Sequence, residues 1–337
     1  MRCSVWLLGL ALLAGDEVDL RLLHPVDGVR TLEVSLEGEA QVESSRTLVD
    51  GRPVEVPAPL TRTIEVARRT VLRDTFRDVE GERVEAFERV VERADWTSSM
   101  QMVDPYGGRH ASESERRSGL VGEVLHFTRE GGGFVARREG EDEGPPLEGL
   151  RATPDWSRLL PDGPLAVGAA WEVELDFLAD LREPGGELDW SEAAAQEAAR
   201  ELHAPAGSTT YRGRIAARLE AVEDGEARIA LEVDGTSELD LTPFLPEPEG
   251  GEHEGGRHRL ELRSVRIAAD LAGEGQVLWS LTDGAPRSLE LELRADEVET
   301  VDFGHTQLAA GLGAPHDVKI EAVTESRVVE RITVHLR

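Results

Sequence analysis

Apolar and polar residues alternate along most of the chain after residue 16. Leu32, Val34 and Leu36 are separated by polar residues, and similar runs recur to the C-terminus. Because successive side chains of a strand point to opposite faces, this period of two predicts strands with one buried face. Asp50-Gly51 between two such runs is typical of a tight hairpin turn. The pattern therefore predicts a mainly β protein built from long antiparallel hairpins.

Residues 60–96 fit two interpretations. Ile64, Ala67 and Val71 have helical spacing, but β-branched residues, which favour strands, are frequent in the same segment. We interpret the segment as two long strands joined by a turn at residues 80–82. Its arginine and glutamate side chains would then pair across the exposed face, each pair contributing roughly 0.2–1 kcal/mol.

The second half of the chain repeats the hairpin pattern. Turn sequences at residues 223–225 and 283–284 separate alternating runs. The alternation slips by one residue at 263–264, which indicates a β-bulge. Long hairpins with one apolar face must bury that face. We therefore expect a curved sheet, a half-barrel or a sandwich.

The expected organisation has four parts. A chain of 337 residues is long enough for one large domain or two ordinary ones. We expect a signal peptide over residues 1–15, an N-terminal β lobe over 16–154, a central strand and helix over 155–206, and a C-terminal β lobe over 207–337.

One α-helix is predicted, over residues 189–203. Asp189 can cap its N-terminus, with Glu192 three residues later in the register of a capping box. Residues at helical spacing form an apolar stripe, namely Trp190, Ala194, Ala198 and Leu202. Pro205 and Gly207 follow and end the helix.

The central stretch 155–175 predicts a turn that leads into a strand. Pro161 and Pro164 enclose Asp-Gly, which is typical of turns because proline presets φ and glycine accepts positive φ. The apolar positions of the alternating run that follows are Leu165, Val167, Trp171, Val173 and Leu175. Gly168 interrupts this run, and we expect it to bend the chain so that Trp171 turns into the core.

The same stretch resembles a family motif. Pro164-x-x-Val167-Gly168-x-x-Trp171, preceded by Leu159-Leu160-Pro161, is similar to a motif in uncharacterised secreted proteins of GC-rich environmental bacteria. The resemblance implies a signal peptide followed by β-rich sequence on both sides of the motif, and it implies no activity. A later element is similar too, Gly273-Glu274-Gly275 followed by Trp279. Ala169 stands where the family usually has Asp, which argues against a ligand site built on that carboxylate. We interpret the motif residues as structural, namely Pro161, Pro164, Val167, Gly168 and Trp171.

The N-terminus has the features of an export signal. Arg2 supplies a positive charge, and the apolar run 5–14 is too short to span a bilayer but suits a signal core. We expect cleavage near Gly15 and a secreted or periplasmic mature chain. A lipid anchor is not expected, because Asp16 stands where a lipoprotein signal needs cysteine. Cys3, the one cysteine, lies in the signal, so the mature chain would have no disulfide.

The charge of the chain excludes some partners. With 67 acidic and 37 basic residues, the formal net charge is −30. Such a chain repels phosphate backbones and anionic membrane surfaces, so nucleic acid is not expected as a partner. Aromatic residues make up 4% of the chain, which argues against a stacking platform for bases or sugars. No segment after the signal has the length and apolarity of a transmembrane helix, so no integral membrane segment is expected.

Two histidine-containing segments bear on metal or cofactor binding. His253 and His258 stand five residues apart in a glycine-rich loop, whereas the zinc-protease motif needs two histidines four apart on a helix. With nearby glutamates this loop can bind a metal weakly, and a solvated loop is the simpler interpretation. His305 and His316 flank a glycine-rich stretch that lacks the spacing of a dinucleotide-binding motif. The sequence therefore predicts no catalytic residue, no cofactor and no metal site.

These observations support a non-catalytic protein that binds or scaffolds in the cell envelope. Its expected partner is an envelope protein or a hydrophobic small molecule. One alternative is a half-barrel carrier of a lipid-like ligand, which would need an apolar groove between the sheet and the helix, behind Trp171. A second alternative is a hydrolase, because a carboxylate pair can form in three dimensions without a sequence signature.

Overall fold

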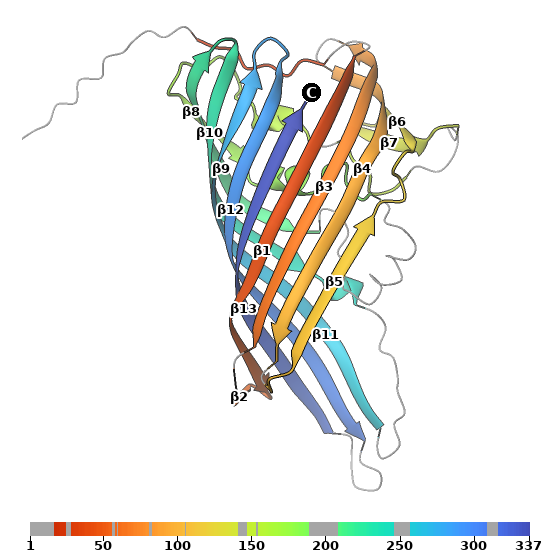
Figure 1. Cartoon of the computed structure of the whole chain (residues 1–337), viewed down its shortest axis with the longest axis vertical. Coiled ribbons are helices and arrows are strands. Elements are labelled where there is room, and N and C mark those ends of the chain that lie inside the picture. Colours follow the sequence, from red (N-terminus) through yellow and green to blue (C-terminus); the bar gives the residue numbers. More distant parts are fainter. Residues whose placement is uncertain are drawn as a thin grey trace, which may run out of the picture.

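The computed structural model describes residues 17–24, 28–55, 58, 60–80, 83–104, 106–140, 147–152, 154–188, 208–245, 257–308 and 316–337. The expected signal peptide over residues 1–15 and the expected helix over residues 189–203 lie outside these residues. Within them, most of the regular structure is β-strand, and the molecule is elongated along its strands (Figure 1).

The described elements follow the expected hairpins. The strands are β1 (Val29–Val49), β2 (Arg52–Val54), β3 (Thr61–Glu80), β4 (Arg83–Val103), β5 (Arg109–Arg117), β6 (Val124–Glu130), β7 (Gly133–Arg138), β8 (Ala170–Glu174), β9 (Thr210–Glu223), β10 (Glu226–Asp240), β11 (Arg257–Ser280), β12 (Ala285–Leu308) and β13 (His316–Leu336). The helical segments are the 3₁₀ helices η1 (Trp156–Leu159) and η2 (Thr242–Phe244) and the α-helix α1 (Phe177–Arg182).

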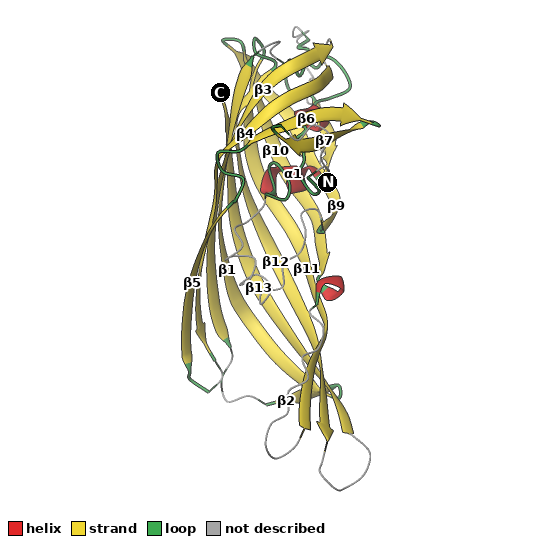
Figure 2. Cartoon of the chain, turned by 90° about the vertical axis from the view of Figure 1, so that its right-hand side faces the viewer, coloured by secondary structure: helices red, strands yellow, loops and turns green. Residues whose placement is uncertain are grey.

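Thirteen strands of the described residues form one antiparallel sheet. Their order is β7-β6-β4-β3-β1-β13-β12-β11-β10-β9-β8, with β2 paired to β1 and β5 paired to β4. β1 and β13 pair from Leu32↔Leu336 to Val49↔Ile320, so the two halves of the chain meet in the middle of the sheet. The sheet curves, and α1 lies inside the curve (Figure 2). The prediction of a mainly β protein with long antiparallel hairpins in a curved sheet is confirmed.

Residues 61–80 and 83–96 are strands, as predicted, and the helical alternative is wrong. β3 and β4 form one long hairpin, and their charged residues pair on the exposed face. Arg73 Nε lies 2.7 Å from Glu92 Oε1, and Arg77 Nη2 lies 2.6 Å from Glu88 Oε2. Because these pairs are solvated, their net contribution is small, and the apolar face of the hairpin accounts for most of its stability.

The turn sequences have the expected geometry. Asp50 and Gly51 have φ of 49° and 75°, and Asp224 and Gly225 have φ of 51° and 80°. Two successive positive φ angles are the geometry of a type I′ hairpin turn, whose twist matches that of the flanking strands. The register of β11 against β12 also shifts between residues 262 and 264, so the predicted bulge is confirmed.

One hydrophobic cluster lies against the inner face of the sheet. It includes side chains from both halves of the chain, from η1 and from α1, so the two expected lobes share a core. Gly235 on β10 marks a close approach between the sheet and the segment that leads into α1. A Cβ atom at this position would collide with Leu175, which leads into α1, and with the backbone of β9.

A buried polar cluster fastens α1 to the sheet. Arg182, the last residue of α1, forms an ion pair with Glu330 on β13. Its Nη1 donates to the hydroxyl of Tyr211 on β9 (2.9 Å), and Arg68 Nη1 on β3 donates to the Arg182 carbonyl (3.1 Å). Burial lowers the pKa of Arg182, but Glu330 and Tyr211 outweigh burial and raise it above its ordinary range. These contacts tie α1 to strands from both halves of the chain.

α1 is not among the elements that the sequence predicts. The helix has six residues, too few for a helical period to be visible, and Pro184-Gly185-Gly186 follow its end. Within the described part of the chain, the structure holds no helix of the length and apolarity needed to cross a membrane.

Candidate functional site

A cavity of about 480 Å³ has Leu336, next to the C-terminal residue, in its lining. The C-terminus lies at the upper end of the molecule in Figure 1. The β3–β4 hairpin, the β6–β7 hairpin and η1 surround the cavity. Each supplies aromatic side chains, namely Phe76 on β3, Phe87 on β4, Phe134 on β7 and Trp156 on η1. The volume falls within the roughly 300–1,000 Å³ of clefts that bind small molecules.

The aromatic rings contact one another across the cavity wall. The ring centroids of Phe76 and Phe87 are 6.1 Å apart, and those of Phe87 and Phe134 are 5.3 Å apart in an edge-to-face arrangement. Register places Phe76 directly opposite Phe87 on neighbouring strands. Such pairs are stabilising because the positive edge of one ring meets the negative face of another. The wall is therefore a continuous apolar surface.

A buried arginine lies behind this wall. The side chain of Arg89 is 3% exposed, and its Nε and Nη2 each lie 2.7 Å from a carboxylate oxygen of Asp74. Its Nη1 donates to the Arg151 carbonyl (2.8 Å), and its Cζ lies 5.2 Å from the centroid of Phe87. A bidentate pair of this kind has fixed geometry, so Arg89 holds β3, β4 and the segment around residue 151 together.

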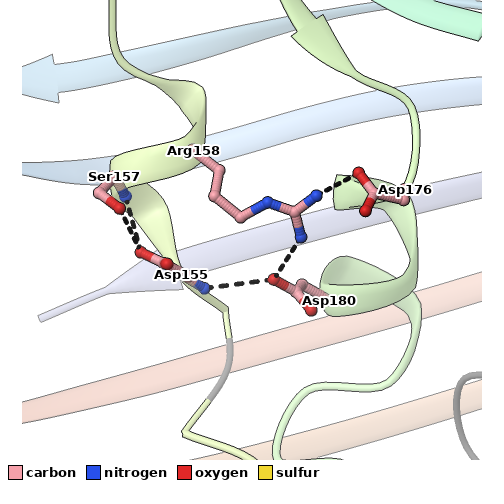
Figure 3. A network of polar contacts seen from close by, with 5 residues as sticks. All are labelled: Asp155, Ser157, Arg158, Asp176 and Asp180. Atoms are coloured by element: carbon pink, nitrogen blue, oxygen red, sulfur yellow. Dashed lines mark hydrogen bonds and ion pairs between the residues drawn. The ribbon is translucent and has the colours of Figure 1, made fainter. Parts of the chain in front are cut away.

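Trp156 is positioned by a polar network between η1 and α1 (Figure 3). The network consists of Asp155, Ser157, Arg158, Asp176 and Asp180. Arg158 contacts the carboxylates of Asp176 and Asp180, and the amide nitrogen of Asp155 lies 3.4 Å from Asp180 Oδ2. Burial raises the pKa of Asp180, and these donors oppose the shift. The network fixes η1 against α1.

The fixed position of η1 turns Trp156 towards the core. The Trp156 ring stands edge to face with Phe177 of α1, with centroids 5.9 Å apart. The side chain is 6% exposed and still lines the cavity. The central stretch of the sequence thus contributes to the site through Trp156.

His24 lines the cavity from the extended segment 17–24. Its ring centroid lies 5.2 Å from that of Phe76, and its Nδ1 is buried without a hydrogen-bond partner in the described residues. Burial, and then the charge of Arg30, lower the pKa of His24 from 6.5 to about 4, while Asp155 opposes the shift. The imidazole is therefore neutral at pH 7.

Lowering the pH from about 6.5 to about 4 is expected to destabilise the folded protein through His24. In this window the unfolded state binds a proton that the folded state does not, so the free energy of unfolding falls as the pH falls. The measurement is urea unfolding of the wild type and of His24→Gln at several pH values. As the pH falls, the free energy of unfolding should decrease more for the wild type than for His24→Gln. A constant difference would contradict the expectation.

A second hollow of about 620 Å³ adjoins the first across His24 and Arg30. Its lining includes Ser280, Asp283 and Arg287 and no Phe, Tyr or Trp among the described residues. Because it lacks an aromatic wall, it is a weaker candidate for binding an apolar ligand.

The motif residues do not line the cavity. Pro164 and Gly168 are exposed, Pro161 is half-buried, and Gly168 has φ of 92°, which agrees with the expected bend. Val167, predicted on the buried face, is 52% exposed, because the turn at Gly168 separates it from β8. Trp171 is half-buried, and its Nε1 donates to the Leu159 carbonyl (2.9 Å).

The region behind Trp171 is filled by side chains. Leu159, whose carbonyl accepts from Trp171, is fully buried, and Trp171 packs against the cluster that also includes Phe177, Leu178 and Leu181. The described residues therefore leave no apolar groove at the position where a carrier of a lipid-like ligand was expected to have one. Trp190 and Leu202 of the expected helix, whose side chains could also fill this region, lie outside the described residues.

The histidine segments give no site in the described structure. His253 lies outside the described residues, and the side chains of His258, His305 and His316 are not described. Among the side chains that the structure describes, no group of three or more His, Cys, Asp or Glu is arranged to hold a metal ion.

The cavity was not predicted from the sequence. One signal was present, because Phe76 and Phe87 lie at similar distances from the turn expected at residues 80–82, and a hairpin brings such positions together, as β3 and β4 do. Phe134 and Trp156 come from segments with no local sign of their position, and only the path of the chain brings them to this hairpin.

No family model matches the chain, and the comparison with curated proteins found no match. Among solved structures, the chain is similar to an outer membrane channel from Pseudomonas putida F1, with 9% identity, a TM-score of 0.25, and coverage of 96% of this chain and 99% of that one. It is also similar to OccK7 (OpdD) from Pseudomonas aeruginosa, with 9% identity, a TM-score of 0.18, and coverage of 92% and 99%. At TM-scores this low, neither likeness bears on the function of this chain.

Proposed function

We propose that this protein is a secreted or periplasmic, non-catalytic binding protein that holds a small hydrophobic ligand in the aromatic cavity. The observation that carries the proposal is the cavity of about 480 Å³ with Phe76, Phe87, Phe134 and Trp156 in its lining. Aromatic residues are only 4% of the chain, so their convergence on one cavity is not a consequence of composition. The export signal expected over residues 1–15 supports a secreted or periplasmic location.

Two further features support binding at this place. The rim of the cavity includes the exposed residues Arg83, Gly132 and Ser157, which gives a ligand a path from solvent. The wall behind the rings is fixed by the Arg89–Asp74 pair, so the apolar surface is held in place before a ligand arrives. A preformed cavity that combines an apolar wall with polar groups able to orient a ligand is typical of small-molecule sites.

Titration with N-phenyl-1-naphthylamine, a neutral dye that fluoresces in apolar surroundings, tests the proposal. We expect saturable binding of one dye per wild-type chain. Ala152→Trp places a large ring in the cavity and should abolish the signal. Ala111→Trp makes the same change at an exposed position of β5 and should leave binding unchanged.

Two outcomes would overturn the proposal. One is the absence of dye binding to the folded wild-type protein, and the other is equal binding by Ala152→Trp. The natural ligand can then be identified in protein purified gently from its own host. Native mass spectrometry should show a bound molecule in stoichiometric amount, and extraction with an apolar solvent should recover it.

A further inference from the structure

The cavity gathers positive charge in a strongly acidic chain. The whole sequence has 67 acidic and 37 basic residues, for a net charge of −30. Among the described lining residues this balance is reversed. The charged lining residues are Arg30, Arg83, Arg89, Arg129, Asp74 and Asp155.

Two of these arginines are neutralised by their own partners. Arg89 makes its bidentate pair with Asp74, and Arg83 forms an ion pair with Glu85 at the rim. Their charges are compensated without a ligand. The charge available to a ligand therefore comes from the other two arginines.

Arg30 and Arg129 have only carbonyl partners in the described part of the chain. Arg30 Nη2 donates to the carbonyl oxygens of Leu23 and Asp283. Arg129 Nε donates to the Val84 carbonyl (3.1 Å), and its Nη1 donates to the Gly132 carbonyl (3.3 Å). A carbonyl oxygen satisfies a hydrogen bond but does not cancel a full charge, so both guanidinium groups remain attractive to an anion.

Burial makes the positive charge of Arg30 energetically unfavourable. Desolvation lowers the pKa of Arg30, and the carboxylates of Asp283 and Asp74 offset the shift only in part. An anion bound beside Arg30 would supply the missing compensation.

Both arginines also lie over the aromatic wall. Arg30 Cζ is 5.9 Å from the ring centroid of Phe76, and Arg129 Cζ is 4.5 Å from that of Phe134. The buried Nδ1 of His24, beside Phe76, adds a polar atom that has no hydrogen-bond partner among the described residues. The lining thus combines apolar rings with cationic groups at their faces, which is the complement of an amphipathic anion.

We infer that the ligand is a small amphipathic acid, whose apolar body lies on the aromatic wall and whose carboxylate is attracted by the positive charge that Arg30 and Arg129 bring to the cavity. This inference rests on the proposed function and adds the chemical class of the ligand. The acid is ionised at neutral pH, and its negative charge complements two guanidinium groups whose hydrogen bonds, among the described residues, go to carbonyl oxygens.

Displacement of N-phenyl-1-naphthylamine by decanoate and by decan-1-ol at pH 7.5 tests the inference. The two competitors share a chain length and differ in charge. In the wild type, decanoate should bind about tenfold more tightly than decan-1-ol. The reason is that hydrogen bonds from a guanidinium group to a carboxylate are stronger than those to a neutral hydroxyl. In Arg30→Gln and Arg129→Gln the preference should fall, while the affinity for decan-1-ol should stay the same.

Arg77→Gln is the matched control, because it removes the same charge from an arginine of β3 that does not line the cavity, is paired with Glu88 and is 55% exposed. It should keep the preference for decanoate. Unchanged binding of the neutral dye shows that each variant is folded. Equal affinity of the wild type for decanoate and decan-1-ol would overturn the inference and leave the proposed function standing. Failure of the wild type to bind the dye would overturn the proposed function itself.

Discussion

Replacing Glu330 by alanine is expected to lower the free energy of unfolding by about 3–5 kcal/mol, the cost of removing one partner of a buried ion pair. Glu330 is 8% exposed and forms the ion pair with Arg182 at the end of α1. Without this carboxylate, the guanidinium group remains buried with the hydroxyl of Tyr211 as its side-chain partner. A hydroxyl does not balance its charge, so the helix loses its attachment to β13.

Urea unfolding followed by circular dichroism measures this effect. The control is Glu292→Ala, which removes a carboxylate paired with two arginines that are 72% and 64% exposed. Because water solvates those partners, its unfolding midpoint should change little. In the double variant Arg182→Leu/Glu330→Leu no buried charge is left unpaired, and much of the lost stability should return. An unchanged midpoint for Glu330→Ala would show that the pair does not hold α1 on the sheet.

Replacing Trp279 by alanine is expected to lower the free energy of unfolding by about 3–5 kcal/mol, as for other large buried aromatic residues. Trp279 on β11 is fully buried in the common core. Its removal leaves a large cavity in the core against the sheet, and β11 cannot move to fill it, because its backbone is held by hydrogen bonds to β10 and β12.

The same unfolding experiment tests this prediction with two comparisons. Val298→Ala changes a side chain that is 40% exposed and should alter the stability by no more than about 0.5 kcal/mol. Trp279→Phe should be less damaging than Trp279→Ala, because it keeps most of the ring. It also removes an indole nitrogen that is buried without a hydrogen-bond partner in the described residues. If Trp279→Ala lowers the free energy of unfolding by less than about 1 kcal/mol, the substitution does not create a persistent cavity in the core.

Local patterns were sufficient to predict the strands. The period of two placed Leu32 and Val34 on a buried face, and both are buried. Asp50-Gly51 predicted its hairpin because few other residue pairs accept two positive φ angles in succession. These features depend on backbone sterics and on burial of one strand face, and both act over a few residues.

Local patterns could not predict the short helix or the exposure of Val167. In α1, six residues show no full helical period, and contacts with Glu330 and Tyr211, far away in the sequence, hold the helix in place. Val167 is apolar and in phase with the strand, but the turn at Gly168 separates it from β8 and leaves it exposed.

The sequence by itself determined the strands, their turns and the mainly β class, because alternation and turn chemistry are local properties. Only the tertiary structure decided that both halves share one sheet, since the pairing of β1 with β13 joins the two ends of the chain. It also decided where the site lies. Phe76, Phe134 and Trp156 meet at one cavity because three separate segments close over the same end of the sheet, and such long-range contacts leave no periodic signal in the sequence.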